Sequence, residues 1–382
     1  MKPSRLLVIS ELFLPTKGGT PVWYDAVYRR MGDRNLHIVT AAVADSAAID
    51  DSHPNSIHRV GLKRVWWLKP ESLGMYAKML GQSLLLALHH RFDAVHGARA
   101  LPEGLVAWIM ARLLRKPLVV YCHGEELTTW GQGRKFRTML WVYRHADANI
   151  ANSEYTVEEM VRLGVPRASI TMIYPGVDTD RFRPGLPCAD LKPSIGLHAG
   201  QKLILSVGRL VRRKGFDQVI RALPELVQQG IDAHYALIGI GEDWNYLTGL
   251  AAELGVSDRL HLLGHVSPED LPRWYNACDV FAMTNREING DTEGFGMVFL
   301  EAAACGKPAI AGNAGGTGAA VVDGVTGYRV DGTKVTEIVR SLALVLGDSE
   351  LSRALGQAGL DRAIAEFSWD RVALRTRDLV EK

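Results

Sequence analysis

Short apolar runs alternate with longer amphipathic segments along the whole chain. Apolar runs placed between helical patterns predict buried strands of a parallel sheet that is covered by helices on both faces. The same alternation occurs in both halves, so the sequence predicts the α/β class with two doubly wound, Rossmann-like domains. The expected strands are Leu6–Ser10, His37–Thr40, Ala94–His96, Leu118–Cys122 and Ala148–Ala151, then Leu203–Val207, Ala233–Ile238, Leu260–Leu262, Val280–Met283, Pro308–Ala311 and Gly327–Val330.

A stretch rich in proline and glycine, from Tyr174 to Pro187, has turn signals and no periodicity, and it separates the two halves. The length of 382 residues also suits two domains. Ser368 is a candidate N-cap for a last helix beginning at Trp369, which we expect to return to the first domain. Ligands bind outside the carboxyl ends of parallel strands, so a cleft between two such domains is the expected site. The expected boundaries are 1–183 for the first domain, 184–366 for the second, and 367–382 for the returning segment.

Two glutamates eight residues apart, Glu293 and Glu301, enclose the most informative run of the chain. Two glycines between them let the backbone approach a ligand closely. The apolar residues that follow predict the start of a buried helix, and a helix N-terminus binds phosphate through its unpaired N–H groups and its dipole. Glu301, about two turns into that helix, can accept hydrogen bonds from sugar or ribose hydroxyls.

A basic cluster follows the strand expected to end at Val207. Arg209 and Lys214 each stand beside a glycine at the junction between strand and helix. Breaking a bond between a sugar and a diphosphate builds negative charge on the leaving phosphate, and two fixed cations can stabilise that charge in place of a metal. The alternative is solvated surface charge. We expect Arg212 and Arg213 to be exposed.

The first half carries two weaker signals. Gly18 and Gly19 form a turn between the first strand and a helical stretch, which can bring backbone N–H groups to an anion or serve only as a turn. His123 follows the strand expected to end at Cys122. It can bind a sugar hydroxyl, stabilise positive charge through its carbonyl, or be structural, and the sequence does not separate these roles.

Composition excludes several classes of function. The 44 Lys and Arg residues against 42 Asp and Glu leave a net charge of +2, which gives no case for nucleic-acid binding. Four cysteines without C-x-x-C spacing favour a reducing cytoplasm over a disulfide framework or a zinc cluster. No strand is followed by G-x-G-x-x-G, so a dehydrogenase is disfavoured. The D-x-D run Asp178–Asp180 lies in the expected linker, and we expect no metal site.

No apolar stretch approaches the roughly 20 residues that cross a bilayer, so we expect a cytoplasmic protein that is soluble or peripheral at the inner face of the membrane. Basic and aromatic residues are interleaved in Arg59–Lys69 and Arg134–Arg137. These segments can rest on anionic lipid headgroups, or they can be partly buried loops with solvated charges.

Together these motifs resemble the retaining glycosyltransferases of family four, whose GT-B fold has two facing Rossmann-like domains. The resemblance covers essentially the whole chain. The segment from Ala282 to Gly296 is especially similar to bacterial mannosyltransferases acting on phosphatidylinositol mannosides and related polyprenyl or lipopolysaccharide acceptors. The matching motifs are Glu293–Glu301, Arg209 with Lys214-Gly215, His123-Gly124, Gly18-Gly19 and the linker Pro175-Gly176-Val177-Asp178.

The resemblance implies a role for each matching residue. Arg209 and Lys214 would hold the donor diphosphate, with Gly19 nearby. Glu293 would contact the donor sugar and Glu301 the ribose. The resemblance thus implies that His123, Arg209, Lys214 and Glu293 are catalytic, with His123 near the C6 hydroxyl, and that the donor is bound by Gly18, Gly19, Arg209, Lys214, Glu293, Gly294, Phe295, Gly296, Met297, Val298 and Glu301.

The implied activity is metal-independent transfer of a hexosyl unit, with retention, to a lipid-linked or saccharide acceptor in cell-envelope glycan or glycolipid synthesis. GDP-mannose is the favoured donor and a UDP-hexose the second, with no further cofactor. A sugar-nucleotide epimerase would need additional acid and base groups, and a non-catalytic binding module would not need both Arg209 and Lys214. One departure is the run Gly315–Ala319, which lacks the proline and glutamate of the Gly-Gly-x-Pro-Glu motif found in many relatives.

Overall fold

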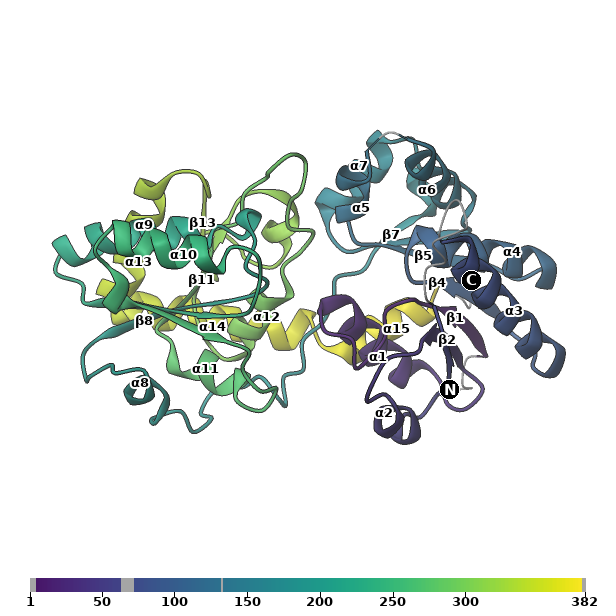
Figure 1. The fold of residues 1–382 in the computed structure, drawn as a ribbon, viewed down its shortest axis with the longest axis horizontal. Helices are drawn as coiled ribbons and strands as arrows, with labels where there is room; N and C mark the ends of the chain where they lie inside the picture. Colours follow the sequence, from purple (N-terminus) through teal and green to yellow (C-terminus); the bar gives the residue numbers. More distant parts are fainter. Residues whose placement is uncertain (1–4, 63–71, 132, 380–382) are drawn as a thin grey trace. The chain divides into compact units, whose positions relative to one another are not determined.

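The computed structural model describes residues 5–62, 72–131 and 133–379, which form two α/β units (Figure 1). Unit 1 comprises Met1–Pro175 and Trp369–Lys382, and unit 2 comprises Gly176–Ser368. Every pairing within the two sheets is parallel. The predicted class, two doubly wound parallel sheets, is confirmed.

Unit 1 contains a seven-stranded sheet in the order β3-β2-β1-β4-β5-β6-β7. The five strands expected in the first half are present as β1, β2, β4, β5 and β6, and nearly all of their residues are buried. The strand bounds are β1 Leu6–Ile9, β2 His37–Ala41, β3 Ser56–Val60, β4 Ala94–Gly97, β5 Leu118–Cys122, β6 Ala148–Ala151 and β7 Ile170–Met172.

The two strands that the sequence did not predict, β3 and β7, are the edges of this sheet. All five residues of β3 are only partly buried, and β7 has three residues. Their sequence pattern is weak because β3 mixes polar with apolar residues and β7 is very short, whereas the edge strands of unit 2 have a readable pattern. In β3, Arg59 is paired with Asp50 at 2.7 Å, and its side chain is 12% exposed. The rest of the expected basic segment, residues 63–69, lies outside the described residues.

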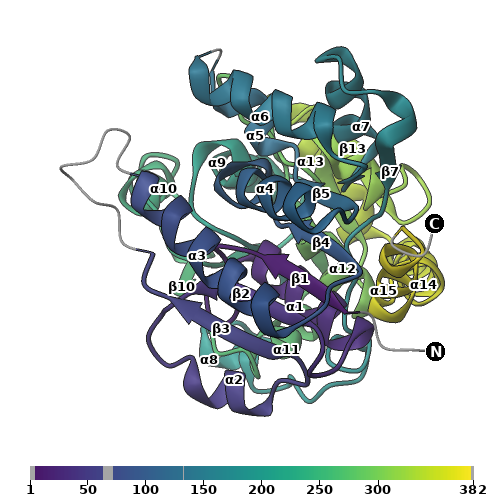
Figure 2. The same ribbon diagram turned by 90° about the vertical axis from the view of Figure 1, so that its right-hand side faces the viewer.

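Helices cover both faces of the unit 1 sheet. Helices α3, α4 and α6 lie side by side on one face (Figure 2), where α4 contacts both of its neighbours. Helices α1 and α15 contact each other. The helices are α1 Gly19–Met31, α2 Ala47–Ser52, α3 Leu73–His89, η1 Ala100–Gly104, α4 Leu105–Leu114, α5 Glu125–Thr129, α6 Arg134–His145, α7 Glu154–Arg162, η2 Arg167–Ser169 and α15 Trp369–Arg377.

Helix α15 begins at Trp369, the position indicated by the candidate cap. An ion pair of 2.8 Å joins Arg30 of α1 to Asp370. Arg377 donates to the backbone carbonyls of Arg30 and Met31 at 3.0 and 3.1 Å. Helix α15 is thus attached to the first helix of unit 1.

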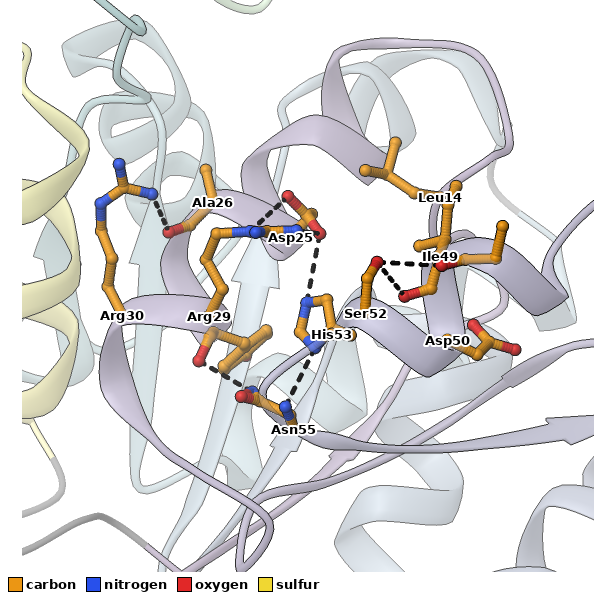
Figure 3. A network of polar contacts seen from close by, with 12 residues as sticks. Leu14, Asp25, Ala26, Arg29, Arg30, Ile49, Asp50, Ser52, His53 and Asn55 are labelled. Carbon is orange, nitrogen blue, oxygen red and sulfur yellow. Dashed lines mark hydrogen bonds and ion pairs between the residues drawn. The ribbon is translucent and has the colours of Figure 1, made fainter.

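A polar network fixes α1 to the segment between α2 and β3 (Figure 3). Arg29 donates two hydrogen bonds to Asp25, at 2.8 and 2.9 Å, and the fully buried His53 lies 3.2 Å from the same carboxylate. Burial alone would raise the pKa of Asp25, but His53 and Arg29 outweigh it and hold the pKa below its ordinary value. Asn55 donates to the carbonyl of Tyr28 at 2.8 Å. These contacts position α1, which begins at the Gly18-Gly19 turn.

Unit 2 contains a six-stranded sheet in the order β10-β9-β8-β11-β12-β13, and all six strands were predicted. No helix within the described residues is long and apolar enough to cross a membrane. The strands are β8 Lys202–Val207, β9 Ala233–Ile238, β10 Leu260–Gly264, β11 Val280–Met283, β12 Ala309–Gly312 and β13 Gly327–Val330. The helices are α8 Leu191–Ser194, η3 Arg212–Lys214, α9 Phe216–Gln228, α10 Trp244–Glu253, η4 Ser257–Arg259, α11 Leu271–Ala277, α12 Met297–Ala304, η5 Gly315–Ala319, α13 Val335–Gly347 and α14 Ser349–Glu366.

Candidate active site

The loops that follow β8 and β11 meet at the carboxyl-end edge of the unit 2 sheet. The two strands are neighbours. Gly215, which precedes α9, has a φ of +74°, and a Cβ on it would lie 1.9 Å from the carbonyl oxygen of Thr284. Only glycine permits this approach without a backbone shift. The close contact brings the basic cluster of the first loop against the acidic residues of the second.

Glu293 is the centre of an ion-pair cluster formed by these two loops. Its carboxylate lies 2.5 Å from Nζ of Lys214 and 2.9 Å from Nη1 of Arg213. Arg213 also lies 3.0 Å from Asp291. The expectation that Arg213 is exposed is wrong, because the residue is only 9% exposed. Its guanidinium is drawn inward by the two carboxylates, and a mostly buried charge requires such partners.

The two cations keep Glu293 ionised. Burial by itself would raise the pKa of this carboxyl group, but the charges of Lys214 and Arg213, together with their hydrogen bonds, hold it below the ordinary value. The side chain of Glu293 is therefore a hydrogen-bond acceptor at neutral pH. It is 13% exposed, so part of it is open to a ligand.

Arg209 and Arg212 behave differently from Arg213. Arg212 lies at the surface, 3.1 Å from Asp243 and over the ring of Tyr246. Arg209 is exposed, and within the described part of the chain its side chain forms no hydrogen bond or ion pair. The cluster around Glu293 thus contains two cations, Lys214 and Arg213, and two carboxylates. Arg209 has no carboxylate partner among the described residues, so its exposed guanidinium is available for an anion.

A second buried ion pair holds the β11 loop in place. Arg286 donates to both carboxylate oxygens of Asp217, at 2.9 and 3.0 Å, and the side chain of Asp217 is 4% exposed. The backbone N–H of Arg286 donates to the carbonyl of Arg213 at 2.8 Å. A bidentate pair of this kind fixes orientation as well as distance. It therefore supports the placement of Arg213 and, through it, of Glu293.

Helix α12 begins at Met297, directly after the glycines, as the pattern predicts. Gly296 precedes it with a φ of +87°, where a Cβ would lie 2.7 Å from the ring of Phe299. Glu301 accepts a hydrogen bond of 2.7 Å from the hydroxyl of Tyr275. Burial raises the pKa of Glu301 to about 7, although Tyr275 and Arg181 lower it in part. This carboxyl group therefore titrates near physiological pH.

The divergent segment Gly315–Ala319 forms η5 and lies against Glu293. The backbone N–H of Gly316 donates to the carbonyl of Glu293 at 2.8 Å. A Cβ on Gly315, whose φ is +71°, would lie 2.2 Å from that carbonyl oxygen. The glycine pair therefore supports the backbone of Glu293 even though the proline and the glutamate of many relatives are missing.

In unit 1, His123 lies at the carboxyl end of β5 with most of its polar atoms engaged. Its Nε2 is 2.6 Å from the hydroxyl of Tyr24, which in turn donates to the carbonyl of Ala98. Because that hydroxyl has one proton, Nε2 of His123 donates and Nδ1 is left as an acceptor. Asn152 donates to the carbonyl of His123 at 2.9 Å. Burial lowers the pKa of the imidazole, so the ring is neutral at pH 7.

The Gly18-Gly19 turn is the second predicted feature of unit 1. Gly18 has a φ of +132°, and a Cβ on it would meet no atom closer than 3.8 Å. Helix α1 has no acidic residue in its first turn. The structure thus leaves open space at this helix N-terminus and places no carboxylate in the first turn that would repel an anion.

Sequence reasoning missed a charged group at the ends of β1 and β4. Arg99 lies 3.1 Å from Glu11 and 3.3 Å from Glu103, whose side chain is fully buried. Glu103 also accepts from the backbone N–H of Glu11 at 3.0 Å. The signal for Glu11 and Arg99 was available, since each closely follows a predicted strand. Glu103 lies in η1 and not directly after a strand, so the expectation that functional residues follow strand ends does not point to it.

No group of three or more His, Cys, Asp or Glu residues within the described ranges is arranged to hold a metal ion. The D-x-D run has a local role instead. Asp178 accepts from the backbone N–H groups of Asp180 and Arg181, both at 3.1 Å, so its side chain stabilises a turn. Neither unit thus presents an evident cation site among these residues.

The two halves of the chain each match a glycosyltransferase family. Residues 17–181 match "Glycosyltransferase Family 4", and residues 189–362 match "Glycosyl transferases group 1". Over 382 residues the chain is 31% identical to a GDP-mannose-dependent alpha-(1-6)-phosphatidylinositol monomannoside mannosyltransferase of Mycolicibacterium smegmatis, with 98% of each protein covered. The chain therefore belongs to the family-four glycosyltransferases. It is a retaining hexosyltransferase that takes its sugar from a nucleotide-sugar donor.

More distant proteins share the fold. The structure of Anabaena HepE in complex with UDP and glucose has a TM-score of 0.83 at 20% identity, covering 99% of this chain and 100% of that one. WaaG, a glycosyltransferase involved in lipopolysaccharide biosynthesis, has a TM-score of 0.71 at 16% identity, covering 98% and 99%. These likenesses establish the GT-B fold.

Proposed function

We propose that this protein transfers a mannosyl unit from GDP-mannose to a lipid-linked or saccharide acceptor in cell-envelope glycan or glycolipid synthesis, working in the cytoplasm at the inner face of the membrane. The observation that carries the proposal is the full-length similarity to GDP-mannose-dependent mannosyltransferases, 31% identical in one case. A relative that shares both halves of the chain shares the regions on which donor and acceptor depend.

The cationic cluster supports the handling of the donor. Lys214 has three N–H donors, so its ammonium group can keep its ion pair with Glu293 and still donate a hydrogen bond to a phosphate oxygen. Arg209 adds a further positive charge, and no carboxylate among the described residues pairs with it. Backbone N–H groups of Gly296 and Met297 stand at the start of α12, where a helix favours phosphate. These groups stabilise the charge that develops on the leaving diphosphate.

The remaining roles are those that the family resemblance implies, and the hydrogen-bonding capacity of the residues supports them. Glu293 is ionised and accepts from donor-sugar hydroxyls, and the free Nδ1 of His123 accepts from the C6 hydroxyl. In the transfer, the bond between the anomeric carbon and the phosphate oxygen breaks while a bond to the acceptor oxygen forms on the same face. The proton of the acceptor hydroxyl passes to the leaving phosphate, so no metal and no protein base is required.

A UDP-hexose is the second candidate donor. It is favoured by one structural likeness, since the HepE structure with a TM-score of 0.83 contains UDP and glucose. At 20% identity, that likeness shows the fold alone.

A thermal-shift screen with GDP, UDP, ADP and their sugar conjugates tests the donor. A ligand at about 100 times its Kd stabilises the native state by about 2.7 kcal/mol, so GDP and GDP-mannose are expected to raise the Tm by several degrees while the others have little effect. A selective shift with UDP would replace the proposed donor by the second candidate. A selective shift with ADP, or no shift with any nucleotide, would contradict both.

The pH dependence of GDP binding tests the role of Glu301. Ribose hydroxyls donate to the ionised carboxylate, and the pKa of about 7 means that binding at lower pH must release a proton. We therefore expect GDP affinity, measured by calorimetry, to rise about tenfold between pH 6 and pH 8. Glu301→Gln is the control, because it keeps the titration of the GDP phosphate and removes that of residue 301. An equal pH dependence in the two proteins would mean that Glu301 does not contact the ribose.

A further inference from the structure

A cavity of about 280 Å³ lies at the edge of the unit 2 sheet where its strands begin. Among the residues that line it, Lys202 begins β8, Asp279 directly precedes β11, and Lys307 stands two residues before β12. Ser352 and Arg353 of α14 line it as well. Ligand pockets usually have volumes of about 300–1,000 Å³, so this cavity has room for a small ligand.

Three of the residues that line the cavity are basic, and none of them has a carboxylate partner. The side chains of Lys202, Lys307 and Arg353 form no hydrogen bond or ion pair within residues 5–62, 72–131 and 133–379. Like charges around one cavity repel each other, and an anion bound there relieves the repulsion. The cavity therefore favours a negatively charged ligand.

The acidic residues near the cavity do not neutralise these three cations. The carboxylate of Asp279 lies 2.7 Å from Nζ of Lys192 and accepts a hydrogen bond of 2.7 Å from the backbone N–H of Leu203. Asp348 caps α14 by accepting from two backbone N–H groups, at 3.0 and 2.9 Å. Glu350 is exposed and does not line the cavity. Each of these carboxylates thus leaves the positive charge of the cavity in place.

Close packing fixes the walls of the cavity. Gly356 of α14 packs against the turn between α12 and β12, where a Cβ on it would lie 2.2 Å from the carbonyl oxygen of Gly306. Cys278, Val345 and Leu346 also line the cavity, and all three are buried. A cavity with preformed walls binds a ligand without first ordering its own chain, which favours affinity.

The cavity is separate from the donor residues of the same unit. Arg209 and Lys214 follow the carboxyl end of β8, whereas Lys202 stands at its amino end. The strand has six residues, so its two ends are roughly 20 Å apart. Ligands of doubly wound sheets usually bind at the carboxyl edge. The argument for a ligand at the opposite edge therefore depends on the basic lining and not on the fold.

We propose that this cavity binds a phosphate group, carried either by free inorganic phosphate or by a sugar phosphate. Lysine and arginine side chains hold phosphate through charge-assisted hydrogen bonds, and the guanidinium of Arg353 can donate to two phosphate oxygens at once. Ser349 and Ser352 line the cavity as well, and their hydroxyl groups can donate to further oxygens. Such binding does not require GDP-mannose as the donor, so its test is independent of the proposed function.

Titration calorimetry of the full chain with inorganic phosphate, mannose 6-phosphate and mannose tests the proposal. Both phosphate-bearing probes are expected to bind, and mannose is not, because a neutral sugar gains little from the three cations. Tighter binding of mannose 6-phosphate would identify a sugar phosphate as the ligand. An equal or higher affinity for inorganic phosphate would identify the free ion. Absence of binding by both phosphate-bearing probes would overturn the proposal.

Variants locate the bound phosphate. Lys307→Gln with Arg353→Gln is expected to weaken phosphate binding at least about tenfold, because it removes two charged donors. Ser352→Leu should weaken binding similarly by filling the cavity without a change of charge, so the test does not depend on the stability of the first variant. Lys334→Gln with Arg340→Gln is the matched control, since it removes two exposed cations of unit 2 that do not line the cavity. Its phosphate affinity should equal that of the parent chain.

Lys214→Ala distinguishes this cavity from the donor site. The variant lacks a cation of the donor cluster and should still bind both phosphate-bearing probes, whereas the variant with Lys307→Gln and Arg353→Gln should keep the GDP affinity of the parent chain. Unchanged phosphate binding in both cavity variants would overturn the proposal. So would loss of phosphate binding in Lys214→Ala, since the phosphate would then occupy the donor site.

Discussion

Replacing Lys214 with alanine is expected to lower kcat by about 10²- to 10³-fold, the usual cost of removing one donor that stabilises an oxyanion. The side chain of Lys214 is 12% exposed, and in such a setting its attraction to a developing phosphate charge is screened less than in water. GDP affinity should fall as well, because the diphosphate also carries charge in the ground state. Arg209 remains, so activity should be residual rather than zero. Initial rates with radiolabelled GDP-mannose measure the effect.

Lys334→Ala is the matched control for this substitution. Lys334 lies in the same unit at the surface, where it pairs with Asp331 and Glu337, and 59% of its side chain is exposed. Its removal should change kcat by less than about twofold. Turnover by Lys214→Ala within about twofold of the parent would show that the diphosphate is held elsewhere. Tm measurements establish that both variants are folded.

Replacing Glu293 with alanine is expected to lower the rate of transfer by at least about 10²-fold. The affinity for GDP should stay the same or rise. The carboxylate accounts for the proposed contact with the donor sugar, which GDP lacks, and its removal frees Lys214 for the phosphates. GDP affinity should fall in Lys214→Ala but not in Glu293→Ala, and this difference distinguishes the roles of the two residues. Removing Glu293 also leaves Lys214 without its carboxylate partner, so a stability loss of about 2–3 kcal/mol is expected.

Two further variants keep this second prediction testable. Glu293→Gln preserves the shape of the side chain and should lose transfer with a smaller loss of stability. Asp291→Asn removes a carboxylate that also pairs with Arg213, but one whose side chain is 40% exposed and has no proposed sugar contact, so it should keep most activity. Near-normal turnover in Glu293→Ala would show that Glu293 does not contact the donor sugar. A loss of GDP affinity equal to that of Lys214→Ala would show the same.

The strands show which parts of the fold were readable from local pattern. Eleven strands were predicted, and each is present. Most of them lie inside their sheet, where a strand covered on both faces must be apolar along its length. The strand Ser56–Val60 escaped prediction because it mixes polar with apolar residues, and Ile170–Met172 because it has only three residues. The position of α12 was also readable, because a glycine pair followed by an apolar run marks a helix start.

The sequence by itself determined the two doubly wound sheets and drew attention to Lys214, Glu293 and Glu301, because strand-end loops and helix starts have local signatures. Only the tertiary structure decided that Arg213 is buried beside Glu293, a residue 80 positions away. That pairing depends on the adjacency of β8 and β11, which are separated along the chain by two other strands.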